Sequence, residues 1–377
     1  VAGLVGMAAT TGIKTTATGQ DTAMTPLFAP VEIGADLSAL PNSERQALAH
    51  IVDAARVMDG IFLEQVWAGN PSMLLSLLNS DAAAGQATLD FFLLNKGPWS
   101  RIDENRRFVA GAPVKPEGAN FYPAGATKAE VAAWFDQLEG AARADATGFF
   151  TTIRRGIDGG FAIVPYNLEY QGPLAIAAGH LRAAARATAQ PTLRRYLETR
   201  AAAFESNDYY DSDVAWMELD STIEPTIGPY EVYEDEWFNY KAAFEAFVTI
   251  RNDGETTNLA RFGDHLQDLE DALPIEPRFR NPALGTLAPI RVVDVVFTAG
   301  DANRGVQTAA FNLPNDERVV REKGAKRVML KNVQEAKFEQ VLTPISAVVL
   351  PDTEQADVSF EAFFTHILMH ELMHGLG

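Results

Sequence analysis

Apolar side chains recur at helical spacing over several stretches of this chain. From Asn42 to Trp67 they fall three and four positions apart, after a Pro-Asn-Ser-Glu start that is typical of a helix N-terminus. A Thr-Lys-Ala-Glu capping box predicts another helix from Thr127 to about Arg143. Residues 175–186 and 192–204 predict two further helices, rich in Ala, Leu and Arg, which a Gln-Pro pair separates.

Strand-like runs are fewer than helical ones. Val- and Ile-containing segments at Ile290–Thr298, Arg327–Leu330 and Ile345–Leu350 predict short strands. Residues 96–126 carry many Gly, Pro and Asn and predict irregular structure. The chain has no internal repeat and no low-complexity tract. These patterns together predict a mostly helical α+β protein.

The final predicted helix starts near Asp357 or Ser359, and either residue can cap it. It is apolar enough to predict burial, although it carries His370, Glu371 and His374. Burying these three polar side chains costs free energy unless a metal pairs with them. Four residues turn an α-helix by only about 40° beyond a full turn, so both imidazoles can reach one ion. This HExxH spacing is that of zinc hydrolases, in which the glutamate takes a proton from metal-bound water.

The remaining histidines carry weaker signals. His366 precedes His370 by four residues, but three ligands on one straight helix would span about 12 Å and could not meet on one ion. His366 is therefore predicted to be a core residue or a residue that supports a metal ligand. Three further histidines lie on separate segments and are predicted to be surface or capped residues: His50, His180 and His265.

A group of aspartates and several missing motifs narrow the function. Asp208, Asp211 and Asp213 lack the glycine and terminal glutamate of a calcium loop, so they predict a solvated turn. The chain has no GxSxG nucleophile elbow, no P-loop and no dinucleotide-binding fingerprint. Serine hydrolase, nucleotide hydrolase and dehydrogenase classes therefore have no support.

Composition and charge restrict the partners. The chain has 377 residues, 47% of them hydrophobic, which allows a sizeable core and more than one lobe. Its net charge of -19 disfavours nucleic acid and anionic membranes and would favour a cationic ligand such as a peptide amine. It has no cysteine, so disulfides and cysteine-based metal chemistry are excluded. No apolar run approaches the roughly 18 residues of a membrane span, so we expect a soluble protein, cytoplasmic or periplasmic.

Three separated segments of the chain carry further motifs. Residues 230–235 read Tyr-Glu-Val-Tyr-Glu-Asp and are followed by Phe-Glu-Ala-Phe at 244–247. Residues 312–315 read Asn-Leu-Pro-Asn, and the third segment is the terminal HExxH motif. In order and spacing, the three segments resemble the dipeptidyl peptidase III family, peptidase family M49, over about residues 225–377. The five-residue HExxH is similar to that of some bacterial and plant-type relatives, whereas better-known members have a six-residue form.

The resemblance implies a metal site that this chain supplies only in part. His370 and His374 would bind Zn²⁺, and Glu371 would activate water. A catalytic zinc needs three protein ligands, and the third is expected from a glutamate beyond Gly377. We therefore expect the 377 residues to be a segment of a longer polypeptide that would be inactive alone.

The resemblance also implies a site for the free N-terminus of a peptide. Glu231, Asn312 and Asn315 would accept the ammonium protons, while Tyr233 and Glu245 would line the cleft. The sequence alone favours another explanation of the two asparagines, a turn around the intervening proline. An ordinary half-buried pair would likewise explain the tyrosine and the second glutamate.

The family's fold is two-lobed, with a cleft between a helical lobe and a lobe that contains a small β-barrel or sheet. Residues 1–252 and 296–342 would form the mixed lobe with the substrate-binding segments. Residues 253–295 and 343–377 would begin the helical zinc-bearing lobe, which is expected to be completed beyond this chain.

These observations predict a zinc-dependent exopeptidase that releases dipeptides from peptide N-termini. One alternative is a related metallohydrolase with a non-peptide substrate, because fold does not dictate substrate. The other is a catalytically inactive, peptide-binding relative whose terminal helix is simply core.

Overall fold

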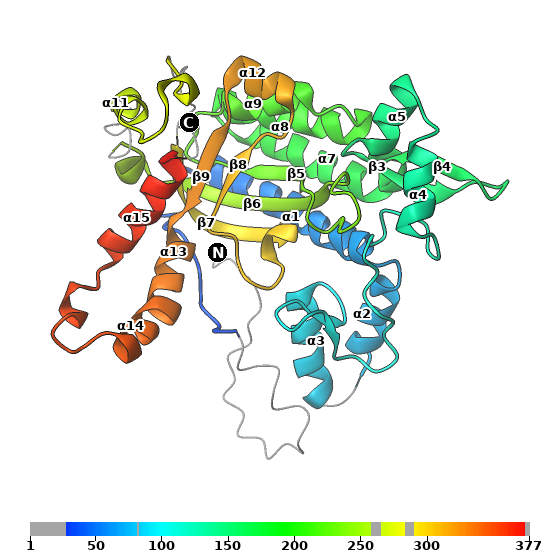
Figure 1. The fold of residues 1–377 in the computed structure, drawn as a ribbon, viewed down its shortest axis with the longest axis horizontal. Coiled ribbons are helices and arrows are strands. Elements are labelled where there is room, and N and C mark those ends of the chain that lie inside the picture. Colours follow the sequence, from blue (N-terminus) through cyan, green and yellow to red (C-terminus); the bar gives the residue numbers. More distant parts are fainter. Residues whose placement is uncertain (1–27, 81–82, 258–264, 283–289, 374–377) are drawn as a thin grey trace.

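The computed structural model describes residues 28–80, 83–257, 265–282 and 290–373 (Figure 1). Its centre is a mixed sheet of five strands in the order β5-β6-β7-β9-β8, in which only β7 and β9 pair in parallel. The strands are β5 (Thr226–Glu231), β6 (Ala243–Arg251), β7 (Ile290–Gly300), β8 (Ala310–Leu313) and β9 (Lys326–Leu330). The α+β prediction and the strands predicted near 290 and 327 are confirmed.

Three long helices form a layer that covers this sheet (Figure 1): α1 (Asn42–Val66), α7 (Gln171–Ala187) and α8 (Pro191–Ser206). α1 packs on β6, β7 and α7, and α7 packs in turn on α8. The side chain of Glu44, at the start of α1, accepts hydrogen bonds from Thr188 Oγ1 at 2.7 Å and from Ala189 N at 2.8 Å, just after α7. The two helices therefore run antiparallel, and all three confirm the predicted helical segments.

Shorter elements surround this core. Two small hairpins are β1 (Trp99–Ser100) with β2 (Arg106–Arg107) and β3 (Thr151–Arg155) with β4 (Phe161–Pro165). The other helices are α2 (Asn70–Leu78), α3 (Ala83–Asn95), α4 (Lys128–Phe135), α5 (Gly140–Thr147), α6 (Tyr166–Glu169), α9 (Tyr210–Met217), α11 (Leu266–Asp271), α12 (Glu317–Lys323), α13 (Lys331–Lys337), α14 (Thr343–Val349) and α15 (Phe360–Met373). No helix among the described residues has the length and apolarity needed to cross a membrane.

The helix predicted from residue 127 to 143 is in fact two helices. Its capping box forms as predicted: Thr127 Oγ1 accepts from Glu130 N, and the Glu130 carboxylate accepts from Thr127 N. α4 then ends at Phe135, and α5 begins at Gly140, which has a φ of 55°. Since that left-handed conformation cannot continue a right-handed helix, the chain turns there.

The strand predicted over residues 345–350 is wrong, because this segment forms α14. Pro344 occupies the first turn of α14, where its missing N–H is not needed. Ile345, Val348 and Val349 are 51%, 85% and 67% exposed, so their apolar side chains do not fill a sheet. A π-helical turn over residues 338–342 joins α13 to α14.

α15 attaches to the sheet through a narrow apolar stripe. Ser359 Oγ caps it by accepting from Ala362 N at 3.2 Å. Phe364 and Leu368, one turn apart, are buried in a small core with Ile290 and Val292 of β7 and Met329 of β9. The prediction of a buried helix is wrong for its other described faces, because His366 and His370 are exposed.

The segment between β5 and β6 is held by two buried acids. Asp235, fully buried, accepts from the phenol of Tyr122 at 2.8 Å. It also accepts four hydrogen bonds from its own loop, donated by the backbone N–H groups of Trp237, Phe238, Tyr240 and Lys241. One carboxylate therefore fixes the path of the loop that follows β5.

The neighbouring Glu234 anchors the same loop to distant parts of the chain. Its side chain is 0% exposed and forms ion pairs with Arg101 at 2.8 Å, Lys115 at 3.1 Å and Arg304 at 3.0 Å. Burial alone would raise the pKa of Glu234, but the three cations outweigh burial and hold it at about 2.

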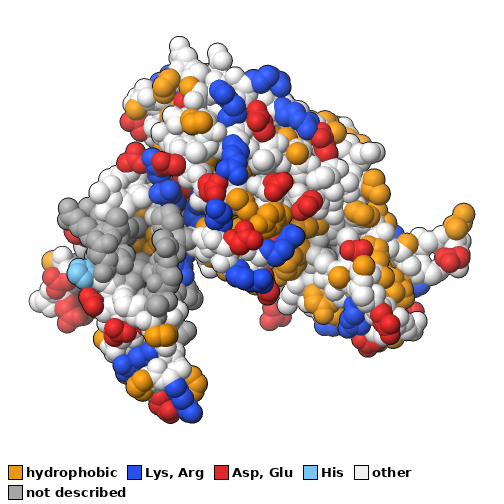
Figure 2. Space-filling model, turned by 90° about the horizontal axis from the view of Figure 1, so that it is seen from above, with side chains coloured by type: hydrophobic (Ala, Val, Ile, Leu, Met, Phe, Trp, Pro, Cys, Tyr) orange, Lys and Arg blue, Asp and Glu red, His pale blue; other side chains and the backbone are white. Residues whose placement is uncertain are grey.

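The surface differs from these buried sites, because its charges are not gathered around one acid. On the face shown in Figure 2, acidic and basic side chains intermingle rather than forming a single acidic field.

We predict that Glu234 contributes to acid sensitivity. Its pKa lies below the ordinary value, so its stabilising effect is complete above pH about 4.5 and is lost as the pH falls toward 2. The shift corresponds to about 3 kcal/mol of unfolding free energy. Urea unfolding between pH 7 and 3 should show a flatter pH dependence in Glu234→Gln than in the unmodified chain. The exposed Glu198→Gln is the control, and a variant with an unchanged pH slope would contradict the assignment.

Candidate functional site

The two glutamates predicted near the substrate amine lie on adjacent strands. Glu231 ends β5 and is half-buried, whereas Glu245 lies in β6 and is 2% exposed. Glu245 faces Gly300 across the β6–β7 pairing, and Asp301 follows that glycine directly. The fold therefore gathers three carboxylates, of Glu231, Glu245 and Asp301, at one edge of the sheet.

These carboxylates share too few cations. Arg304 pairs with Asp301 and with Glu234, which already binds Arg101 and Lys115. Burial raises the pKa of Glu231, and Arg304 opposes that rise only in part. Burial, together with the charges of Asp301 and Glu231, raises the pKa of Glu245 well above its ordinary value. A cation that entered this cluster would relieve the repulsion among the carboxylates.

The acidic cluster also contains an unused acceptor. Glu245 Oε1 is buried and has no hydrogen-bond partner among the described residues. A buried oxygen without a partner costs free energy, and such atoms often mark a ligand position. Tyr233, by contrast, is 67% exposed and does not join the buried cluster.

The Asn-Leu-Pro-Asn segment lies beside this cluster. Asn312 belongs to β8 and Asn315 follows it after a cis Leu313–Pro314 peptide; both asparagines are exposed. Asn315 Nδ2 donates to the carbonyl oxygen of Tyr230, at 2.8 Å, one residue before Glu231. This bond brings the asparagine motif against the end of β5. No donor among the described residues binds the amide oxygen of Asn315.

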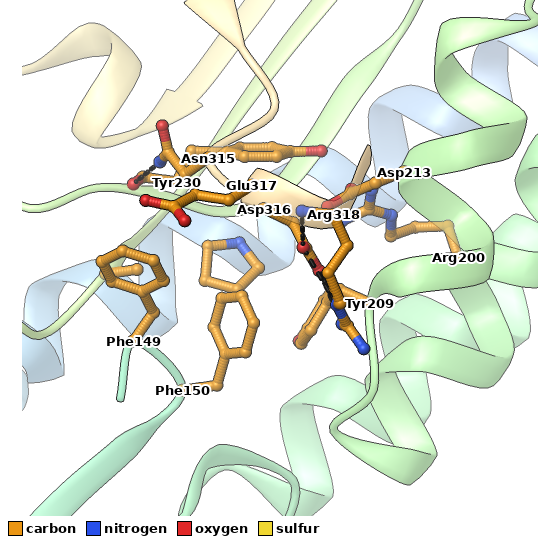
Figure 3. Close-up of a pocket in the computed structure, with 12 residues that line it drawn as sticks. Phe149, Phe150, Arg200, Tyr209, Asp213, Tyr230, Asn315, Asp316, Glu317 and Arg318 are labelled. Atoms are coloured by element: carbon orange, nitrogen blue, oxygen red, sulfur yellow. Dashed lines mark hydrogen bonds and ion pairs between the residues drawn. The ribbon is translucent and has the colours of Figure 1, made fainter. Parts of the chain in front are cut away.

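A cavity of about 370 Å³ opens next to Asn315 (Figure 3). In Figure 3, Phe149 and Phe150 form one wall, Asn315 points toward Tyr230, and Arg200 and Asp213 lie to one side. It lies between β5, the segment that joins β8 to α12, and the helices α8 and α9.

The ion pair between Arg200 and Asp213 beside this cavity shows that the solvated turn predicted for Asp213 is wrong. Asp213 is not in a solvated turn: it is 5% exposed on α9 and accepts from Arg200 Nη2 at 2.5 Å. Burial raises the pKa of Asp213, and Arg200 only partly opposes this. The guanidinium also lies 5.2 to 5.5 Å from three tyrosine rings, those of Tyr196, Tyr209 and Tyr230. Asp208 and Asp211 are exposed, as predicted, although Asp211 lies in the first helical turn of α9.

The described part of the HExxH motif lies on an unbroken helix. α15 continues through Met373, with His370 exposed and Glu371 half-buried. An accessible imidazole with a neighbouring carboxylate that is not fully withdrawn from solvent fits a zinc site in donor chemistry. His374 and the expected ligand beyond Gly377 lie outside the described residues.

Arg327 connects the two predicted sites, and the sequence analysis missed it. It lies opposite Asn312 in the β8–β9 pairing. Burial lowers the pKa of Arg327, and the nearby carboxylate of Glu371 partly opposes that shift. Its Nε is buried with no hydrogen-bond partner among the described residues. The only sequence signal was an arginine inside an apolar strand, which is unusual because a buried guanidinium needs partners.

Comparisons with known proteins place the chain in a family. The model of "Peptidase family M49" matches residues 161–377. The structure of dipeptidyl-peptidase III from Corallococcus sp. strain EGB is 64% identical with a TM-score of 0.89, over 94% of this chain and 66% of that one. The structure of DPP III from Caldithrix abyssi is 46% identical with a TM-score of 0.89, over 93% of this chain and 66% of that one.

A curated protein of Arabidopsis thaliana, named "Nudix hydrolase 3", is 40% identical over 399 residues, which span 93% of this chain and 51% of that protein. The chain thus spans about half of this curated relative and 66% of the two solved structures. The similarity to those structures confirms the predicted fold class. On the family match, the fold and the motifs together, the chain belongs to peptidase family M49, the dipeptidyl peptidase III family.

Proposed function

We propose that this chain is part of a zinc-dependent exopeptidase that releases dipeptides from peptide N-termini. Family membership supports a peptidase that acts on peptide substrates. One observation in the structure carries the proposal. Asn312 of β8 lies opposite Arg327 of β9 in the sheet, and the guanidinium of Arg327 lies near Glu371. Through this link the amine-recognition motif and the hydrolytic motif become neighbours across β8, β9 and α15.

The substrate's ammonium group would be held at the end of β5. Glu231 supplies the negative charge, and the amide oxygens of Asn312 and Asn315 accept the remaining protons. Since burial raises the pKa of Glu231, an arriving ammonium favours its ionised form and gains a charge-assisted bond away from bulk water. Glu245 adds a buried acceptor behind it. Fixing the N-terminus in this way would set the cut at a constant distance from it.

Hydrolysis would take place at α15. His370 and His374, with a glutamate expected beyond Gly377, are the residues that would hold zinc. When bound, the ion would act as a Lewis acid and ease the deprotonation of water. Glu371 would accept the proton of the attacking water and pass it to the departing amine. Arg327 would lie between this carboxylate and the bound peptide segment.

We also propose the two-lobed division of the chain. Residues 1–252 and 296–342 would form the mixed lobe with the substrate-binding segments, and 253–295 and 343–377 would begin the zinc-bearing lobe. The small apolar core that joins Phe364 and Leu368 of α15 to Ile290 and Val292, apart from the main core, supports placing these two segments in one lobe.

We predict that Glu371→Gln, in the protein that includes the region downstream of Gly377, retains zinc and loses hydrolysis. Removing a general base lowers kcat by about 10²–10⁴-fold. Release of arylamine from a dipeptidyl-arylamide substrate would measure activity, and metal analysis would measure zinc. A variant with unchanged turnover would refute the role of Glu371. An unmodified protein that binds zinc but cleaves no such substrate would favour a non-peptide metallohydrolase, whereas one without stoichiometric zinc would favour an inactive relative.

We predict that Glu231→Gln weakens recognition of the free amine. Losing a charge-assisted hydrogen bond should raise KM about tenfold or more, with kcat less affected. In the unmodified protein, binding should weaken as the pH falls through the raised pKa of Glu231, and the variant should lack this dependence. Peptides with an acetylated N-terminus provide the comparison, and the exposed Glu198→Gln is the control. Equal KM values for free and acetylated peptides in the unmodified protein would contradict the role of Glu231.

A further inference from the structure

We propose that His50, Asp53 and His180 form a second divalent-metal site, which links α1 to α7. One ligand atom from each of these side chains lies within 4.8 Å of the others. The two imidazole rings have centroids 6.2 Å apart and are tilted by 37°. This group shares no element with α15, so it is separate from the metal site proposed there.

The distances are close to those of a zinc site. Bonds of about 2.0–2.1 Å in a tetrahedral arrangement place ligand atoms about 3.4 Å apart. The atoms of His50, Asp53 and His180 therefore need to approach by no more than about 1.5 Å. Because all three side chains are only partly buried, rotation about their side-chain bonds can supply this movement without shifting the helices.

The helices hold the three ligands in place. His50 and Asp53 are three residues apart on α1, so they lie on one face of that helix. α7 runs antiparallel beside it and presents His180 at the same level, as the bonds of Glu44 to the end of α7 require. The residues next to these ligands, Ile51, Ala54 and Leu181, are fully buried in the main core. The backbone is thus fixed before any ion arrives.

One atom in the group lacks a partner. His50 Nδ1 is buried and makes no hydrogen bond among the described residues. A competing interaction is weak: Arg56 pairs with Asp53 at 3.1 Å, but these side chains are 54% and 41% exposed. An exposed ion pair contributes little to stability. Arg56 binds Oδ1 of Asp53, and no described residue occupies its Oδ2.

The donor set selects the class of ion. Two imidazole nitrogens and one carboxylate suit Zn²⁺, Co²⁺, Ni²⁺ or Cu²⁺, whereas Mg²⁺ and Ca²⁺ prefer oxygen ligands. Three protein ligands leave at least one position for water. Because the ligands come from two helices, a bound ion would cross-link α1 and α7 and stabilise the folded state.

The site can be tested with Zn²⁺ alone, after removal of bound metal with a chelator. His370→Ala provides a background in which the predicted catalytic site lacks a ligand. Calorimetric titration of this background should show one equivalent of Zn²⁺, with an affinity that falls on the order of 100-fold when His180→Ala is added. His50→Ala removes the ligand from the other helix and should cause the same loss.

A matched control comes from His265. It also lies three residues before an aspartate, with Nδ1 3.5 Å from Asp268 Oδ2, and it belongs to no such three-ligand group in the described part of the chain. His265→Ala should leave the titration unchanged. Zn²⁺ should raise the thermal midpoint of the His370→Ala background but not that of its His180→Ala derivative. Equal Zn²⁺ affinity with and without His50 and His180 would overturn the proposal, whatever the activity of the enzyme.

Discussion

A buried carboxylate is stable only if it is paired with a cation or protonated. This constraint determines the arrangement of the acidic side chains around the end of β5. Glu234 satisfies it with three cations and is held ionised. That balance fixes the loop after β5, but it engages the basic side chains that Glu231 and Glu245 would otherwise use. Glu234 and the two acids proposed to recognise the substrate amine are therefore coupled. Glu234 fixes the geometry of the loop, and Glu231 and Glu245 are left with too little positive charge nearby. An ammonium group is small enough and polar enough to correct that deficit.

The sheet connects this acidic region with the helix that carries His370 and Glu371. β9 pairs in parallel with β7 and antiparallel with β8, so it lies between the strand that anchors α15 and the strand that carries Asn312. Successive side chains of a strand point to opposite faces of the sheet, so residues two positions apart share a face. Met329 packs under α15, and Arg327, two positions earlier, approaches Glu371. A single short strand thus supplies both the apolar support and the charged contact, which makes the relative placement of the two motifs a property of sheet register.

Local patterns predicted the elements well wherever local energetics decides the outcome. The periodicity of α1 and the capping box of α4 depend on residues within a few positions, and both form as predicted. The segment at 345–350 was predicted incorrectly because Val and Ile favour strands only where they can pack against a neighbouring strand and a core. Here Val348 and Val349 are exposed and the segment follows a proline that favours a helix start. Burial of α15 was overestimated for a similar reason, since composition alone does not show how many faces meet a partner.

The candidate functional residues likewise fall into two groups, those within one local motif and those brought together by tertiary packing. The HExxH motif and the Asn-Leu-Pro-Asn segment are local, and the sequence could identify them as candidates. The partnerships of Asp213 with Arg200, of Arg327 with Glu371, and of His50 with His180 arise from tertiary packing. Nothing in the spacing of residues 50 and 180 predicts their contact; it follows from two antiparallel helices whose register is set elsewhere, at Glu44. A histidine that looks isolated in a sequence therefore has no fixed chemistry until the helix opposite it is known. Motif analysis therefore misses clusters of side chains that form only when helices pack together, whereas it detects clusters that lie within one helix.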